Sequence, residues 1–132
     1  MRMGISRDLG FTAEERSENL RRAAEIAKLI NDAGQICIAA FVAPSAWVRQ
    51  KVSELIGIDR FFHVHLSTPV EACRSRDQTG QYEAADKGEI SSFPGVTFDY
   101  ESPADAQLVV NTQMVLAQHV ANRIFAAIME PD

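Results

Sequence analysis

The sequence predicts an α/β fold in which helices flank a parallel sheet. Helical apolar patterns alternate with short apolar runs along the chain. One run, residues 36–42, is almost continuously apolar, which is typical of a strand buried on both faces. Strands that alternate with helices form parallel sheets through right-handed crossovers. We therefore predict the order helix, strand, helix, strand, helix, long loop, strand, helix, within one domain of 132 residues.

The first helix is predicted to follow Thr12 as its N-cap and to run to about Ala33. Glu15 lies three residues after Thr12 and completes a capping box, and Gly34 supplies the C-terminal stop. An apolar stripe at helical spacing indicates the buried face. The stripe consists of Leu20, Ala23, Ala24, Ala27 and Ile30.

The remaining elements follow the same logic. After the strand at 36–42, a helix is predicted over residues 45–56 and a second strand over 61–67. The next helix has Thr68 as its N-cap, Pro69 at its first position and Glu71 closing a second capping box. The last strand and helix are predicted over residues 108–112 and 114–129.

Residues 77–103 show no periodicity and are predicted to form a long lid loop. Long irregular segments within a compact domain are commonly functional. Ligands of parallel α/β sheets bind beyond the carboxyl ends of the strands. Those ends are predicted at residues 42–44, 67–68 and 111–112. The loop leaves the helix that follows the second strand, so it can close over this edge.

Charge and cysteine usage narrow the class of protein. A net charge of −5 argues against a nucleic-acid surface. Residues 1–22 nevertheless carry a balance of +1, which favours a small anionic ligand. Cys37 and Cys73 lack metal-type spacing and are interpreted as reduced thiols of a cytoplasmic protein. No apolar run reaches membrane-spanning length, and the chain does not open on a signal-peptide pattern.

The start of the first helix carries an unexpected charge. A helix N-terminus favours acids, yet Arg16 stands in its first turns, with Asn19 three residues on and Phe11 just before the N-cap. Arg16 cannot serve as the apolar partner of a hydrophobic staple for Phe11. These three side chains could hold a stacked base and an oxyanion. The alternative is a core phenylalanine beside a solvated arginine and asparagine.

The other candidate positions carry weaker signals. Arg76 and Asp77 begin the lid, and Phe93 could form a second aromatic wall, but helix-end arginines and loop phenylalanines are also common structural features. His63 and His65 have no further metal ligand at useful spacing, so no metal site is predicted. No nucleophile has a motif-level base, so no catalytic residue is predicted.

Several separate strings resemble the adenylyl-sulfate kinase (APS kinase) family in the correct order. They are RDLGFTAEERSENLRRAAEIAKLINDAG, ICIAAFVAP, CRSRDQTGQY, GEISSFPGV and YESPADAQLVVNT. The resemblance covers essentially the whole chain. It implies a P-loop NTPase-like fold and the ATP- and Mg²⁺-dependent phosphorylation of the 3′-hydroxyl of adenylyl sulfate to PAPS, in sulfate assimilation. The lid variant is similar to domains fused behind a sulfate adenylyltransferase, and family members commonly form homodimers.

The resemblance also implies a substrate-binding set. Phe11 and Phe93, with its neighbour Ser92, correspond to the residues on the two sides of the substrate adenine. Arg16 and Asn19 correspond to the residues that hold the phosphosulfate and sugar side.

Further positions follow from the same resemblance. Arg2 corresponds to an arginine that contacts adenylyl sulfate, and Val42 and Ala43 to the strand-end pair that contacts it. Arg76 and Asp77 correspond to the start of the lid, on the nucleotide side.

The chain departs from the family pattern in ways that bear on activity. No G-x-x-x-x-G-K-[ST] phosphate-binding loop occurs, and the aspartates expected before Arg2 are absent. Ala43 and Thr79 replace a usual serine and lysine. We expect an incomplete fold without the first strand, P-loop and first helix, with doubtful binding of ATP and Mg²⁺ and no kinase activity in isolation.

A non-catalytic adenylyl-sulfate-binding or regulatory remnant remains open. The occurrence of Phe11, Arg16 and Asn19 together with the lid motif GEISSFPG argues against another small-molecule kinase of this fold.

Overall fold

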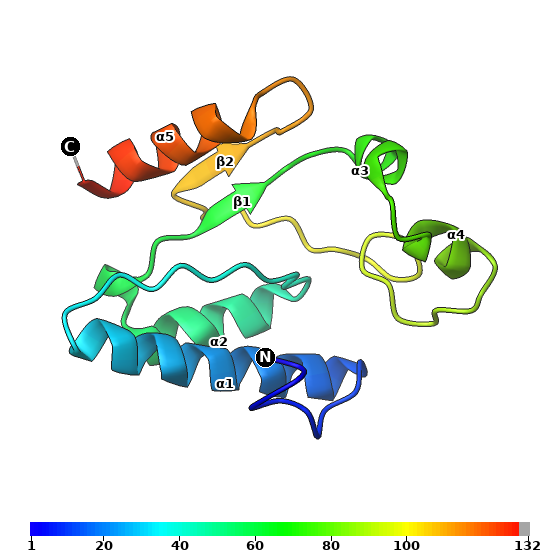
Figure 1. The fold of residues 1–132 in the computed structure, drawn as a ribbon. Coiled ribbons are helices and arrows are strands. Elements are labelled where there is room, and N and C mark those ends of the chain that lie inside the picture. Colours follow the sequence, from blue (N-terminus) through cyan, green and yellow to red (C-terminus); the bar gives the residue numbers. More distant parts are fainter. Residues whose placement is uncertain (130–132) are drawn as a thin grey trace. The chain divides into compact units, whose positions relative to one another are not determined.

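A computed structural model describes residues 1–129, which form two compact units (Figure 1). The first unit comprises Met1–Phe61 and Ser92–Ser102, and the second comprises the residues from Phe62 to Ser91 and from Pro103 onward. The helices and strands, in chain order, are α1 (Ala13–Asp32), α2 (Ala46–Ile56), the 3₁₀ helix η1 (Ile58–Arg60), β1 (Val64–Leu66), α3 (Val70–Arg76), α4 (Gln81–Asp86), β2 (Leu108–Val110) and α5 (Ala117–Met129).

Helix α1 begins and ends as the sequence predicts. The Oγ1 of Thr12 accepts the Glu15 N–H at 3.2 Å, and the Glu15 carboxylate accepts the Thr12 N–H at 3.1 Å. This reciprocal pair satisfies two donors that the first helical turn cannot satisfy itself. At the other end, Gly34 adopts a φ of +78°, a conformation that a residue with a Cβ adopts at a cost. The capping box and the glycine stop are both confirmed.

The core of the first unit lies between α1 and α2. Ala24 and Ala27 of α1 are buried together with Ile56 of α2. Small alanine side chains let the two helices approach closely, so aliphatic side chains of α2 fill the space between them. Partly buried residues surround this cluster; they are Cys37, Val52, Leu55 and Phe61. Ser45 caps α2 by accepting the Val48 N–H, so the predicted second helix is also confirmed.

The strand predicted over residues 36–42 is wrong for the part of the chain that the structure describes. The segment runs without assigned strand structure, and no backbone hydrogen bond joins it to another described segment. Ile38 is 92% exposed and Val42 is 60% exposed, whereas Cys37 is half-buried against the core, so the segment lacks the burial on both faces that its composition predicts. A strand exists only where a neighbour accepts and donates its backbone hydrogen bonds, and none of residues 1–129 does so here.

The second unit holds a two-stranded parallel sheet. Strands β1 and β2 pair in the register Val64↔Leu108, His65↔Val109 and Leu66↔Val110. The strands predicted over residues 61–67 and 108–112 are therefore confirmed in position and direction, although each strand spans only three residues. Helix α5 follows β2 and contacts it; it begins at Ala117, three residues later than predicted.

The capping box predicted at Thr68 and Glu71 is wrong. Pro69 is the N-cap of α3, and no side chain hydrogen-bonds to this helix start. The Oγ1 of Thr68 instead accepts the Thr112 N–H at 3.0 Å and lies 2.7 Å from the Thr112 Oγ1. The hydroxyl thus satisfies a backbone donor at the carboxyl end of β2, where the short ladder leaves that donor without a strand partner.

The predicted lid contains a helix of its own. Helix α4 occupies its first half, and the segment divides between the second unit (77–91) and the first (92–102). Closure of this segment over a ligand stays a prediction. None of the helices in the described part of the chain combines the length and the hydropathy that a bilayer crossing requires.

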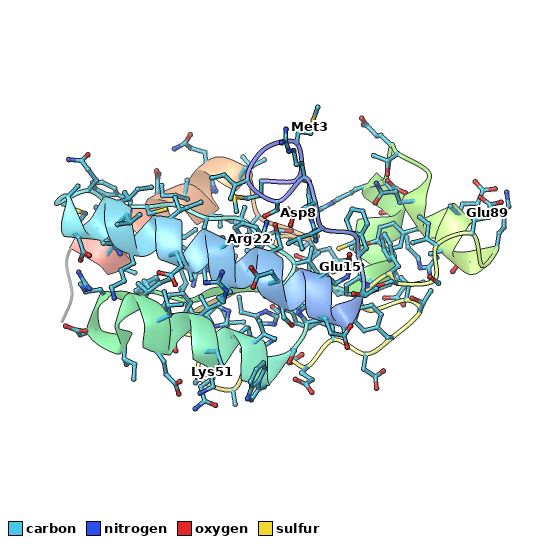
Figure 2. All side chains as sticks on the ribbon, turned by 90° about the horizontal axis from the view of Figure 1, so that it is seen from below. Met3, Asp8, Glu15, Arg22, Lys51 and Glu89 are labelled. Atoms are coloured by element: carbon cyan, nitrogen blue, oxygen red, sulfur yellow. The ribbon has the colours of Figure 1, made fainter. Side chains whose placement is uncertain are left out.

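Arg22 ties the N-terminal loop to α1, and Figure 2 shows it beside Asp8. Its Nη1 and Nη2 donate to the Asp8 carboxylate at 2.6 and 2.8 Å, its Nε donates to Glu18 at 2.8 Å, and its Nη1 also donates to the Ile5 carbonyl. Hydrogen bonds from Arg21 and then Arg22 lower the pKa of Glu18 to about 2, and the hydrogen bond from Arg22 lowers the pKa of Asp8.

This network predicts a stability that depends on acid pH. Because the folded pKa of Glu18 lies below its unfolded value of 4.5, the stabilisation is complete above that value and is lost as the pH falls through about 2. The free energy of unfolding, measured with urea, should therefore be higher for the natural chain than for Arg22→Met at about pH 6. This difference should become smaller as the pH is lowered to about 2. The difference should be small because exposed ion pairs contribute little. A difference that is unchanged by pH would contradict this account.

Candidate functional site

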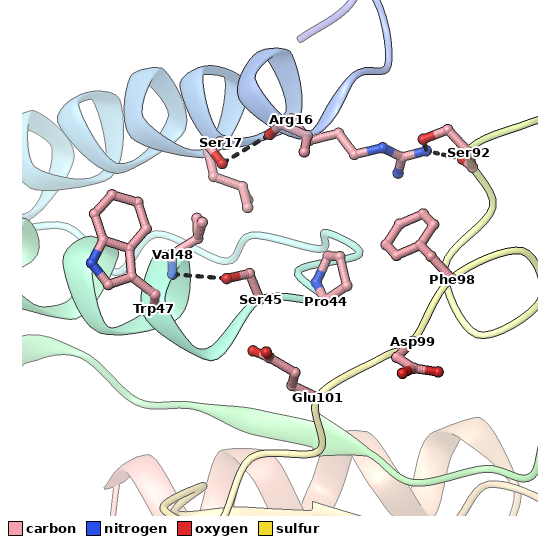
Figure 3. Close-up of a pocket in the computed structure, with 12 residues that line it drawn as sticks. Arg16, Ser17, Pro44, Ser45, Trp47, Val48, Ser92, Phe98, Asp99 and Glu101 are labelled. Carbon is pink, nitrogen blue, oxygen red and sulfur yellow. Dashed lines mark hydrogen bonds between the residues drawn. The ribbon is translucent and has the colours of Figure 1, made fainter.

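A cavity of about 470 Å³ lies in the first unit, beside the N-terminal turns of α1 (Figure 3). Three segments form its walls: the start of α1 with Arg16, the residues 44–48 at the start of α2, and the segment 92–101. Its size falls within the range that proteins use for small organic ligands. The lining mixes apolar groups with the guanidinium of Arg16 at one wall and two acidic residues, Asp99 and Glu101, at another, so an anion is favoured only on the Arg16 side.

Arg16 is fixed at the wall of this cavity by backbone carbonyls. Its Nε donates to the Phe11 carbonyl at 2.9 Å, and its Nη2 donates to the carbonyl and, at 3.1 Å, to the Oγ of Ser92. Figure 3 shows the side chain extending from α1 toward Ser92. The Nη1 of Arg16 donates no hydrogen bond to any of residues 1–129. The N–H groups of Nη1 therefore remain available to donate hydrogen bonds to a ligand.

Aromatic rings and a second cation surround Arg16. Its guanidinium carbon lies 5.7 Å from the ring centroid of Phe11 and 5.7 Å from that of Phe98. Arg2 lies 4.7 Å from the Phe11 centroid and donates to the Gly10 carbonyl at 2.6 Å. Burial and, secondly, the charge of Arg2 lower the pKa of Arg16, which stays protonated at neutral pH. Two neighbouring, partly desolvated cations favour binding of an anion.

Phe11 is not a core residue, because its side chain is 61% exposed. The ring contacts Arg2 and Arg16, and its backbone carbonyl accepts hydrogen bonds from Arg16 and from the Ser92 Oγ at 2.8 Å. An exposed ring beside two guanidinium groups leaves area on which a planar base can stack. Phe11 is not among the residues that line the cavity, and the adenine contact predicted for it stays a prediction.

The structure brings Arg2, Phe11, Arg16 and Ser92 together, as the contacts above show. Asn19 lies on the same helix as Arg16 but is only 7% exposed and does not line the cavity. Its Oδ1 is buried and has no hydrogen-bond partner among the described residues. A buried acceptor without a partner is costly. A role of Asn19 toward the substrate stays a prediction.

The strand-end pair is only partly fixed. Val42 is exposed, whereas the carbonyl of Ala43 accepts a hydrogen bond from the Arg49 Nη1 at 2.6 Å. Ala43 lacks the hydroxyl of a serine, so any contact that it offers a ligand comes from its backbone or its methyl group. The roles predicted for these two residues stay predictions.

Phe98 lines the cavity, whereas Phe93 does not, and sequence reasoning missed Phe98. The backbone folds back between the two: Gly95 adopts a φ of +78°, and its N–H donates to the Phe98 carbonyl at 2.8 Å. The dipeptide Pro94-Gly95 is a turn signal that could have indicated this reversal and hence an aromatic side chain on its far side. The Phe93 N–H donates to the Thr97 Oγ1 at 2.7 Å.

Arg76 and Asp77 belong to the second unit and have structural partners there. Arg76 donates to the carbonyls of Thr112 and Gln113, both at 3.0 Å. The carboxylate of Asp77 accepts the hydroxyl and N–H of Thr79 and the N–H of Tyr82, and the Thr79 hydroxyl is the largest cause of the lowered pKa of Asp77. These bonds fix the turn that precedes α4. A nucleotide role for either residue stays a prediction.

The family is decided by a comparison with family models. Residues 1–111 match the model described as adenylylsulphate kinase. The chain belongs to this family. The resemblance of its motifs is therefore confirmed, and with it the association with nucleotide binding and sulfate assimilation at the level of the family.

Relatives and a solved structure agree with this assignment. The chain is 52% identical over 124 residues to a bifunctional enzyme CysN/CysC of Rhodopirellula baltica, covering 94% of this chain and 19% of that protein. It is 45% identical over 112 residues to the adenylyl-sulfate kinase of Shewanella pealeana, covering 85% and 55%. The chain thus spans about half the length of the curated adenylyl-sulfate kinases that it matches.

The fold matches that of a family member with bound ligands. The structure of the Mycobacterium tuberculosis APS kinase CysC in complex with AMPPNP and APS superimposes with a TM-score of 0.84 at 31% identity, covering 94% of this chain and 73% of that one. The mixed α/β architecture with a small parallel sheet is therefore that of adenylyl-sulfate kinases.

The residues present do not fit an ATP–magnesium site. The 132 residues contain no glycine-rich G-x-x-x-x-G-K-[ST] loop whose backbone N–H groups could surround the donor's phosphates. Within residues 1–129, no three His, Cys, Asp or Glu side chains gather closely enough to hold a metal ion.

Proposed function

We propose that this chain supplies the adenylyl-sulfate half-site of an adenylyl-sulfate kinase domain. The complete domain transfers the γ-phosphoryl group of ATP to the 3′-hydroxyl of adenylyl sulfate and forms PAPS. The observation that carries the proposal is the Arg16 guanidinium. It is fixed between Phe11, Phe98 and Ser92 and keeps donors toward a ligand.

Recognition divides between an apolar and a cationic part. The adenine stacks on the exposed ring of Phe11, with Phe93 on its other side. The sulfated phosphate accepts hydrogen bonds from Arg16, and the nearby Arg2 adds positive charge. Charge-assisted hydrogen bonds from a preorganised arginine are among the strongest that proteins make.

Three further residues complete the proposed pocket. Asn19 holds the sugar side, and the strand-end pair Val42 and Ala43 contacts the substrate. Arg76 and Asp77 remain candidates for the donor nucleotide side of the lid. Because Asn19 is buried and does not line the cavity, its proposed role rests on the family assignment alone.

The proposed fold is incomplete on the donor side. The exposed apolar segment 36–42 has the composition of a strand buried on both faces. We propose that it pairs with strands outside these 132 residues and that the phosphate-binding loop belongs to the same missing part. Phosphoryl transfer depends on positioning and charge stabilisation around the phosphates, so the chain alone transfers nothing.

Partners and location are proposed by analogy with the family. A fused or associated sulfate adenylyltransferase is proposed because the bifunctional relative of Rhodopirellula baltica is much longer than this chain. A homodimer, and a cytoplasmic location, complete the proposal. No role with nucleic acid or membranes is proposed.

The test combines binding with turnover. Calorimetry with adenylyl sulfate should show saturable 1:1 binding to the 132-residue chain, while incubation with ATP, Mg²⁺ and adenylyl sulfate should give no PAPS. AMP serves as the control ligand and should bind more weakly because it lacks the sulfate. Formation of PAPS would overturn the proposed inactivity, and absence of any adenylyl-sulfate binding would overturn the half-site.

A second candidate is a non-catalytic, adenylyl-sulfate-binding regulatory remnant. The absence of the G-x-x-x-x-G-K-[ST] motif from the sequence favours it. The DNA sequence upstream of the codon for Met1 distinguishes the two candidates. An in-frame phosphate-binding loop there indicates part of a kinase domain, and its absence from that frame indicates a remnant.

A further inference from the structure

Arg49 is a buried cation that joins two walls of the cavity. Its side chain leaves α2 and is only 9% exposed. Its Nη1 donates to the Ala43 carbonyl and its Nη2 to the Glu101 carbonyl, both at 2.6 Å, and its guanidinium carbon lies 5.7 Å from the Tyr100 ring centroid. One planar group therefore holds the end of the 36–43 segment and the segment 100–101 at a fixed separation.

Glu101 reinforces the same junction with three different groups. Its carbonyl accepts from Arg49, its N–H donates to the Pro44 carbonyl at 3.0 Å, and its carboxylate accepts the Ala46 N–H. The last contact places a negative charge at the first turn of α2, where the helix dipole favours it. Because the Glu101 carboxylate accepts a hydrogen bond from the start of α2, the hydrogen-bond acceptors of the Arg49 guanidinium are the backbone carbonyls of Ala43 and Glu101.

Residues of this junction form part of the wall of the proposed substrate pocket. Ala43 is a proposed substrate contact, and Pro44, Ser45 and Glu101 line or border the cavity. The segment that ends at Glu101 begins with Ser92, which fixes Arg16. We therefore expect a change at Arg49 to move both the wall formed by Ala43 and Pro44 and the segment that orients Arg16.

We propose that Arg49, seated by Glu101, is a positioning residue of the adenylyl-sulfate pocket. It touches no ligand; it sets the separation between the Ala43 backbone and the segment 92–101. This inference rests on the proposed function. A planar, two-pronged donor is required because two carbonyls must be reached at once. Lysine offers a single point charge and can satisfy one of them well.

The test uses the 132-residue chain and its single tryptophan. Trp47 lines the cavity and follows Ala46, so its fluorescence reports on the pocket. Titration with adenylyl sulfate is compared for the natural chain, Arg49→Met, Arg49→Lys and Glu101→Ala, under conditions where far-UV circular dichroism shows each to be folded. Lys51→Met is the matched control. It removes a cation from the same helix, and the ion pair of Lys51 within residues 1–129 is with the exposed Glu54.

We expect Arg49→Met to raise the dissociation constant by about tenfold or more, since two charge-assisted hydrogen bonds at the pocket wall are lost. Arg49→Lys should recover part of that loss, Glu101→Ala should weaken binding in the same direction, and Lys51→Met should bind as the natural chain does.

The outcomes separate this inference from the proposed function. If the natural chain binds but folded Arg49→Lys and Glu101→Ala bind equally well, with only their unfolding midpoints lowered, Arg49 is merely structural and the inference is overturned. If the natural chain does not bind adenylyl sulfate at all, the proposed function itself fails, and this inference fails with it. Should Arg49→Met not fold, the other two variants decide.

Discussion

Replacing Arg16 with methionine is expected to weaken adenylyl-sulfate binding by about 10- to 100-fold. Methionine keeps a long apolar side chain but removes the guanidinium that lies 5.7 Å from both the Phe11 and the Phe98 centroids. Hydrogen bonds to charged groups typically contribute about 1.5–3 kcal/mol, and each 1.4 kcal/mol is about tenfold in affinity. Isothermal calorimetry of the folded variant measures this loss.

Arg21→Met provides the control for the loss of positive charge. Arg21 lies on the same helix, is exposed, and pairs with Glu18 and Glu25 on its surface. Its removal should change the affinity less than about twofold, because exposed charges are screened by salt and solvent. Equal losses for the two variants would show that general electrostatic attraction, rather than the oriented Arg16, carries the binding.

The Ala24→Asp substitution is expected to unfold the first unit. Ala24 is 2% exposed and belongs to the cluster with Ala27 and Ile56. A carboxyl group there has no room and no polar partner in the cluster, so it either stays charged in an apolar site or takes up a proton on folding. The cost of several kcal/mol is comparable with the whole stability of a small domain, about 5–15 kcal/mol.

Urea unfolding followed by far-UV circular dichroism measures this effect. Leu29→Asp is the matched control, because it introduces the same charge on the same helix at an exposed position. The control should retain most of the unfolding free energy. A folded Ala24→Asp protein with an unchanged midpoint would contradict the assignment of the α1–α2 contact as the core of this unit.

Local sequence signals predicted the parts of the fold that local interactions determine. Thr12 and Glu15 satisfy each other within one turn, so the start of α1 could be read from four consecutive residues. Ser45 before α2 and Gly34 after α1 follow the same logic. These features depend on groups a few residues apart, and such groups are visible in sequence.

The failures concern partners that are distant in sequence. The segment 36–42 has strand composition, but a strand needs a neighbour, and the composition does not state whether that neighbour is present. The Thr68 hydroxyl could accept a hydrogen bond either from an N–H at the start of α3 or from another segment. In the structure it accepts the N–H of Thr112, which lies 44 positions away in the sequence. Local patterns contain no information on such competition.

The candidate site shows the same division. Phe11 and Arg16 could be singled out because each breaks a local rule: one lacks a staple partner, and the other opposes the helix dipole. Phe98 breaks no local rule, and its contact with Arg16 depends on how the segment 92–102 folds onto α1 within the first unit. Arg49 likewise looks like an ordinary helix-surface arginine until its two carbonyl partners are known.

A crystal structure of the chain with adenylyl sulfate tests the central claim most directly. The account predicts the adenine against the ring of Phe11 and a sulfate or phosphate oxygen within hydrogen-bonding distance of the Arg16 guanidinium. Adenylyl sulfate bound elsewhere in the crystal, with the Arg16 guanidinium making only its contacts to Phe11 and Ser92, would contradict it.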